Sequence, residues 1–367
     1  MNGQLSMRMR CLRPSGGGRR RCPVLGGDTA AFCASLVEGL AHLESTLEVE
    51  DNGGGGGGVG SGSVSMRWCA DAMRLVKRMQ REMLEIFRKA DVPAASVVFN
   101  SGGGVAAAAA GDWFEHYMQE TAALLDFCNA FKTAVSRIHR YCMVVDFAAH
   151  LAAGDAAAAA SLVVVESAAA AAACQLASMS PTAFVKNKIA GAKAAVTDAE
   201  RLGRTIVSGG GGGGGAMVVV TLVAKITTSI LSIFVLQALT TSPTSLDVDA
   251  GGSVGPTLIT SDAVDDVPEL RPWCESLSLI HARFPSKATV VEHEKVAMVV
   301  RDLINGKANG GGGHGGQQEG HVELLRARSG ELREGVEMFD CVLDEVFDEV
   351  IRGRNEMLAI LRDKALT

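Results

Sequence analysis

The chain has 367 residues, enough for one large domain or two ordinary ones, and 47% of them are hydrophobic, which is enough for a buried core. Its formal net charge of −6 gives no reason to expect nucleic acid as a partner, because nucleic-acid-binding domains ordinarily carry an excess of basic residues. The nine cysteines are odd in number, scattered and without a C-x-x-C pair, so we interpret them as reduced thiols of a protein that faces the cytosol.

Low-complexity stretches divide the chain. Residues 1–27 contain six arginines and no acid, which predicts a disordered basic arm, with an organelle transit peptide as the alternative. Many of the 43 glycines stand in runs that have too much backbone freedom to order. Residues 28–367 are predicted to form a single helical bundle domain. Low-complexity loops are expected within it at 51–64, 99–111, 209–215, 241–270 and 305–320.

Two helices are predicted in the N-terminal part. The first begins at Asp28 or Thr29, either of which can cap it, and ends near Glu50. The second covers residues 65–90 and carries a basic outer face, which we interpret as solvated because acids are interleaved. Pro93 disfavours a helical residue before it and so ends this helix.

The longest predicted element is an amphipathic helix from Trp113 to Leu151, with Asp112 as its cap. An apolar residue recurs at every third or fourth position, which places one hydrophobic stripe along about ten turns. The stripe consists of Phe114, Tyr117, Thr121, Leu124, Cys128, Phe131, Val135, Ile138, Cys142, Val145 and Ala149. The other faces carry Glu115, Glu120, Lys132, Arg137 and Arg140. Such a helix requires other helices to cover its stripe.

The C-terminal part repeats this pattern. The high helix propensity of alanine predicts a helix over 156–179, and Ser180-Pro181 begins a further segment over 182–208. The spacing predicts helices over 273–284 and 289–304, and a long last helix over 321–366. Sustained 3–4 spacing over several heptads is typical of coiled-coil-like bundle packing. The predicted fold is therefore all-α, a long antiparallel helical bundle with Gly/Ala-rich disordered insertions.

The segment from Ala216 to Leu239 is the most hydrophobic, and its length matches the roughly 20 residues that a bilayer requires. Lys225 interrupts it, and a central lysine costs on the order of 3 kcal/mol on membrane insertion. A spanning segment would also separate the last helices from the 113–151 helix. A single-pass membrane segment and a buried or membrane-apposed bundle helix both stay open, so the expected location is cytoplasmic or membrane-associated.

No motif predicts catalysis, a cofactor or a metal. The glycine runs contain no phosphate-binding G-x-x-x-x-G-K-[ST], and Ala297 stands where a zinc helix beginning at His293 would need its second histidine. His116, His139 and His150 are too widely spaced to converge locally. An acidic strip on the last helix is interpreted as solvated or salt-bridged. This strip consists of Asp340, Asp344, Glu345, Asp348 and Glu349. The chain is predicted not to be an enzyme.

The most identifying string is WFEHYMQETAALLDFCNAF, in which a Trp and a Tyr precede an LLD-x-CNAF motif. A Pro-Trp pair opens the helix at 273, and GRNEML follows the hydrophobic part of the last helix. With an apolar segment after a basic stretch, these features resemble the plant BYPASS family from about Asp28 onward; the Gly/Ala insertions and arginine-rich start depart from it. The matching residues are Trp113, Tyr117, Leu124, Leu125, Asp126, Cys128, Asn129, Ala130, Phe131, Pro272, Trp273, Gly353 and Arg354.

The resemblance implies a plant regulator of root and shoot development that restrains a root-derived mobile signal. Related plant proteins are described as partners of exocyst tethering subunits, so an exocyst subunit is an expected protein partner. No catalytic residue is carried over, and Asp126 and Asn129 are interpreted as helix-surface or inter-helix hydrogen-bonding residues. The leading hypothesis is a non-enzymatic protein that binds another protein or a membrane surface. The alternatives are a membrane-tethered adaptor in secretion and an enzyme of mobile-signal metabolism.

Overall fold

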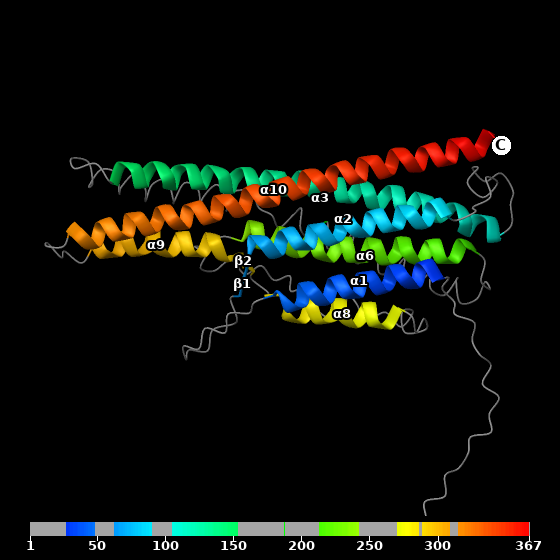
Figure 1. Ribbon diagram of the computed structural model, residues 1–367, viewed down its shortest axis with the longest axis horizontal. Helices are drawn as coiled ribbons and strands as arrows, with labels where there is room; N and C mark the ends of the chain where they lie inside the picture. The colour runs from blue at the N-terminus through cyan, green and yellow to red at the C-terminus, as the bar shows by residue number, and fades with distance from the viewer. Residues whose placement is uncertain are drawn as a thin grey trace, which may run out of the picture.

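Long helices stacked side by side form the molecule (Figure 1). The computed structural model describes residues 27–47, 62–89, 105–152, 187, 213–241, 270–285, 288–308 and 315–366. The predicted all-α fold is confirmed, because nearly all of these residues are helical. The helices are α1 (Gly27–Ser45), α2 (Met66–Lys89), α3 (Val105–Ala152), α6 (Gly213–Thr240), α8 (Arg271–Arg283), α9 (Val291–Ala308) and α10 (Gly315–Leu366).

A small parallel β-pair accompanies the helices, and no pattern in the sequence predicts it. Strands β1 (Ser63–Val64) and β2 (Thr289–Val290) pair in the register Ser63↔Thr289 and Val64↔Val290. Each strand leads directly into a helix. The N-terminus of α2 is capped twice, because Ser65 Oγ accepts a hydrogen bond from Trp68 N and the Glu292 carboxylate accepts one from Met66 N at 3.1 Å. The β-pair therefore fixes the starts of α2 and α9 beside each other.

Helix α6 occupies the centre of the bundle. It packs against α3 and α2 and also touches α1 and β2, while α10 lies over both α2 and α3 (Figure 1). Helices α1 and α8 form a further layer. This layer is joined to α2 by a 2.9 Å hydrogen bond from Trp68 Nε1 to Leu43 O of α1. Since neighbours surround it, α6 can be apolar on nearly every face.

The helices pair in both directions. Helices α2 and α10 run parallel, since Lys77 bonds to Glu345 and Arg81 to Glu349 at the same sequence separation of 268 residues. Helices α3 and α10 run antiparallel. Lys132 of α3 pairs with Asp340 of α10, whereas Asp146, which is later in α3, pairs with Arg333, which is earlier in α10. The antiparallel arrangement expected from the sequence therefore does not describe every neighbouring pair.

Three predicted loops are wrong at their edges. Helix α3 begins at Val105, inside the predicted loop 99–111, so Asp112 lies within the helix; the alanines there have the highest helix propensity. Helix α6 begins at Gly213, inside the loop 209–215, as an extension of the packed helix that follows. Helix α9 extends to Ala308 and α10 begins at Gly315, so the loop 305–320 is also too long. Packing along these helices outweighs the poor propensity of their terminal glycines.

Several predicted segments lie outside the described residues. These are the basic arm through residue 26, nearly all of the loops 51–64 and 241–270, the predicted helix 156–179, and the segment 182–208, of which residue 187 alone is described. At α1, the helix starts one residue before Asp28, so Asp28 lies in its first turn, where it pairs with Lys89 at 3.3 Å instead of capping.

Candidate functional site at the crossing of α3 and α10

Two strings that lie far apart in the sequence meet where α3 crosses α10. Gly353 packs against the buried Tyr117, and a Cβ atom at position 353 would lie only 2.9 Å from Tyr117 Oη. Tyr117 also contacts the edge of Phe87 on α2, with ring centroids 5.5 Å apart. Burial raises the pKa of the Tyr117 hydroxyl, so it stays protonated at neutral pH. Glycine at 353 thus permits the close approach of the two helices.

The neighbouring Arg354 ties the same crossing together by hydrogen bonds. Its Nη1 donates to the Met118 carbonyl oxygen at 2.8 Å and to Thr121 Oγ1 at 2.7 Å. Thr121 Oγ1 in turn donates to the Tyr117 carbonyl oxygen at 2.8 Å. The Gly-Arg pair of GRNEML and the Tyr of the long string therefore form one contact, although 236 residues separate Arg354 from Met118.

Most of the LLDFCNAF string faces the core. Leu124, Cys128 and Phe131 are buried, and Leu125 is partly buried. Asp126 and Asn129 lie on the exposed side of α3, so they are the string's outward polar residues. Trp113 belongs to α3, but its side chain lies outside the described part of the structure. This string holds α3 against its neighbours and offers only its polar residues to solvent.

Trp273 marks a separate junction, between α8 and α6. Its buried Nε1 donates a 2.9 Å hydrogen bond to Thr227 Oγ1, and Pro272 stands in the first turn of α8, where its missing N–H is tolerated. Trp273 is therefore an anchor for α8 and does not belong to the α3–α10 crossing.

A buried polar cluster lies next to the crossing, and the hydrophobic stripe of α3 does not predict it. Glu120, predicted on an outer face, is fully buried, and Gln80 Nε2 donates to both of its carboxylate oxygens at 2.9 and 3.0 Å. The Thr228 hydroxyl lies near this carboxylate and favours its ionised form, although it lacks ordinary hydrogen-bond geometry. The spacing from Tyr117 through Glu120 to Leu124 is itself helical, and it could have placed Glu120 inward.

This cluster also accounts for the lysine in the apolar helix. Burial raises the pKa of Glu120, while Gln80, Thr228 and the positive charge of Lys225 oppose the shift. Lys225 is only partly buried, so its ammonium group stays partly solvated while it stabilises the carboxylate. Lys225 thus has a structural role in a bundle core.

We expect Glu120→Gln to raise the free energy of unfolding by on the order of 1 kcal/mol at pH 8, because it removes a buried charge and still accepts a hydrogen bond from Gln80. A carboxyl group with a raised folded pKa makes the folded state less stable as pH rises above the unfolded value of 4.5. The gain should therefore shrink toward pH 4.5. Urea unfolding between pH 4.5 and 8 measures it, with the exposed Glu334→Gln as control; a constant difference at every pH would contradict the assignment.

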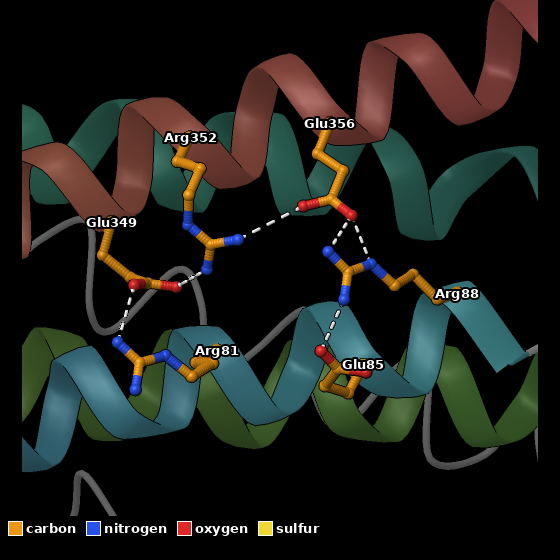
Figure 2. Close-up of polar contacts among 6 residues, drawn as sticks. All are labelled: Arg81, Glu85, Arg88, Glu349, Arg352 and Glu356. Atoms are coloured by element: carbon orange, nitrogen blue, oxygen red, sulfur yellow. Dashed lines mark hydrogen bonds and ion pairs between the residues drawn. The ribbon is translucent and has the colours of Figure 1, made fainter.

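The acidic strip of α10 is largely engaged in ion pairs. Lys132 Nζ contacts Asp340 at 2.6 Å and Asp344 at 2.7 Å, and Lys77 Nζ contacts Glu345 at 2.7 Å. Figure 2 shows how the series continues along the parallel helices. Its members are Arg81, Glu85, Arg88, Glu349, Arg352 and Glu356. The strip is thus a salt-bridged face that joins α10 to α3 through Lys132 and to α2 through Lys77 and Arg81.

Glu349 is the most buried residue in this series of ion pairs between α2 and α10, which we refer to as the ion-pair ladder. Burial alone would raise its pKa, but hydrogen bonds from Arg81 and Arg352 outweigh burial and hold the pKa below its usual range. Arg81 Nη2 lies 3.0 Å from Glu349 Oε2, and Arg352 closes on the other oxygen. Because two cations surround the Glu349 carboxylate and one of them belongs to α2, this contact stabilises the packing of α2 on α10.

The histidines and cysteines do not converge on a metal or catalytic site in the described residues. No group of three or more His, Cys, Asp or Glu side chains there is placed to hold a metal ion. Buried His293 lies against Tyr141, with ring centroids 4.7 Å apart, and burial lowers its pKa to about 4. Burial raises the pKa of the Cys128 and Cys142 thiols to about 12, so they pack as small apolar groups.

The predicted membrane segment is the helix α6, in which the Ala216 side chain lies outside the described part and Leu239 is buried. By length and composition, the stretch Met217–Thr240 could cross a bilayer. In this structure nearly all of its side chains are buried against the other helices. The same features are those of a core helix, and the structure shows α6 in that place.

Comparison with known proteins adds no relative. The chain matches no family model, no curated protein and no solved structure. The resemblance to the BYPASS family therefore depends on the strings described above, two of which the structure brings into contact.

Proposed function

We propose that the chain is a non-enzymatic plant developmental regulator that acts by binding another protein or a membrane surface. Its resemblance to the BYPASS family suggests a role in restraining a root-derived mobile signal that controls shoot and root growth. An exocyst subunit is the expected protein partner, on the same resemblance.

The observation that carries this proposal is the crossing of α3 and α10. Arg354 bonds to Met118 and Thr121, and Gly353 packs on Tyr117, so the two strings of the resemblance form a rigid helix–helix contact. The contact presents two aligned helices to the outside. Apolar side chains at positions 347, 351 and 358 share the side of α10 that carries Arg354, and all three are exposed. An aligned pair of helices with exposed apolar side chains is typical of a protein-binding surface.

The experiment is an affinity purification of the tagged full-length chain from root tissue. We expect a stable partner with the unchanged chain, and loss of that partner with Leu358→Asp, which places a charge on the exposed apolar side of α10. Leu279→Asp is the matched control, because Leu279 is equally exposed on α8. Recovery of no stable partner, or of the same partner with Leu358→Asp, would count against the proposal.

The second candidate is a membrane-tethered adaptor in exocyst-linked secretion. The length and composition of α6 support it, whereas the burial of α6 and its lysine–glutamate cluster favour a core helix. Extraction of plant membranes at high pH separates the two. Release of the chain into the supernatant would exclude a spanning segment, and retention with the lipid would support the tether.

A further inference from the structure

The outer face of α3 carries a short basic and apolar stripe. Arg140, Met143 and Phe147 follow one another at positions i, i+3 and i+7, so they share one side of the helix. Met143 is 71% exposed and Phe147 58% exposed. These are the two most exposed large apolar side chains among the described residues. We refer to Arg140, Met143 and Phe147 as the basic triad.

The positive charge of Arg140 in the basic triad, and that of the neighbouring Arg137, is not balanced by an acid among the described residues. Arg137, one turn before Arg140, and Arg140 itself form no ion pair with any of them. Burial and the nearby Arg140 charge lower the pKa of Arg137, as expected for two neighbouring cations without an acid. This end of α3 therefore attracts an acidic surface that also offers apolar side chains.

Helix α10 carries a triad with the same spacing and the opposite charge. Asp344, Phe347 and Ile351 again occupy positions i, i+3 and i+7, and we refer to them as the acidic triad. Phe347 is 39% exposed and Ile351 37% exposed. Asp344 shares Lys132 with a second carboxylate, and the exposed Asp348 adds another acid, so this face keeps a net negative charge.

The two triads border the same junction but cannot meet within one molecule. Met143 lies about three turns after Lys132, which reaches Asp344, so both triads face the α3–α10 junction. Asp146, beside the basic triad, contacts Arg333 of α10, well before Asp344. At 1.5 Å per residue, the triads are roughly 20 Å apart along the helices.

We propose that a second copy of this chain docks here, with the basic triad of each copy on the acidic triad of the other. In each molecule the two triads lie on the same side and are displaced along the helix axes. When two copies lie antiparallel about a two-fold axis, the basic triad of each copy faces the acidic triad of the other. Such an isologous contact is closed, and it buries the apolar pairs while it joins the opposite charges. The pairing rests on the proposed function, to which it adds a specific partner.

The test is sedimentation of the purified full-length chain at about 0.1 M salt, over roughly 1–100 μM. We expect a dimer whose dissociation constant rises at least about tenfold with Arg137→Glu/Arg140→Glu, and similarly with Asp344→Lys/Asp348→Lys. The variant that combines all four changes should pair again, since the charges are exchanged. This restoration separates a direct contact from simple damage to the fold.

An apolar change supplies the matched control. Met143→Ser should weaken the dimer, whereas Met298→Ser, at a position 55% exposed on α9, should leave it unchanged. A chain that stays monomeric at 100 μM, or a dimer indifferent to these variants, would overturn the pairing. So would a monomer that binds phosphatidylserine vesicles through Arg137 and Arg140, which would assign the stripe to membranes. None of these outcomes affects the Leu358→Asp purification, so the two proposals fail separately.

Discussion

Replacing Phe131 with alanine is expected to lower the free energy of unfolding by about 3–5 kcal/mol. Phe131 is fully buried, stacks on Phe127 with centroids 6.0 Å apart and meets the edge of Phe339 at 6.0 Å. The truncation would leave a cavity between α3 and α10 that these rigid rings cannot fill. Chemical unfolding followed by circular dichroism measures the loss.

The same string offers its own control. Asn129 lies two residues earlier on the exposed side of α3, so Asn129→Ala should change stability by no more than about 0.5 kcal/mol. If both variants cost the same, Phe131 does not hold the core as described. If Asn129→Ala keeps the fold but removes a partner in the affinity purification, the string combines a structural side with a binding side.

Replacing Gly353 with leucine is expected to cost roughly 2–3 kcal/mol, because the new side chain would collide with Tyr117. Even a single Cβ atom would lie 2.9 Å from Tyr117 Oη, and Leu84 stands behind it at 3.8 Å. Tyr117 is held against Phe87 and cannot move away freely. The displaced crossing should also weaken the Arg354 hydrogen bonds to α3.

Gly330 on the same helix gives the opposite result. A Cβ atom there meets nothing within 4 Å, so Gly330→Ala should raise the free energy of unfolding by about 1 kcal/mol through helix propensity alone. Thermal melting of both variants is sufficient. A stabilising Gly353→Leu, or a strongly destabilising Gly330→Ala, would show that the crossing is not as close as described.

The sequence was sufficient to predict the helices that the structure describes, because their patterns are sustained over several turns. The stripes of α3 and α10 are the clearest cases, and their buried positions agree with the spacing from Tyr117 to Ala149 and from Val322 to Val350. Local composition predicts helix ends poorly, as at Val105, where a low-complexity stretch belongs to the helix. Propensity and packing act together there, and only propensity is visible in the sequence.

Contacts between distant segments could not be predicted from periodicity. The β-pair has two residues in each strand and joins segments more than 200 residues apart, too short for any recurring pattern. The capping of Met66 by Glu292 and the Gln80–Glu120 pair depend equally on which helices become neighbours. A single stripe puts Glu120 on an outer face of α3, whereas the helix has a wide buried face that is covered by both α6 and α10.

At the candidate site, too, the residues could be predicted from the sequence but their contact could not. The strings around Tyr117 and Gly353 were identified from the residues, but their mutual contact requires an antiparallel α3–α10 register that neither string contains. The direction of α2 against α10 is a second example. A heptad stripe describes which side of a helix is buried and is the same for a parallel and an antiparallel neighbour.

The parallel pairing of α2 and α10 has a consequence for the order of folding. Arg81 and Glu349 are separated by 268 residues, so the ion-pair ladder closes only after almost the whole chain has been synthesised. At ribosomal rates of about 5–20 residues per second, α10 is synthesised roughly 10–50 s after α2, and during this time the apolar face of α2 that packs on α10 stays uncovered. Contacts this distant in sequence also slow the search for the native topology. Nascent chains that end before α10 should therefore be the species that chaperones retain.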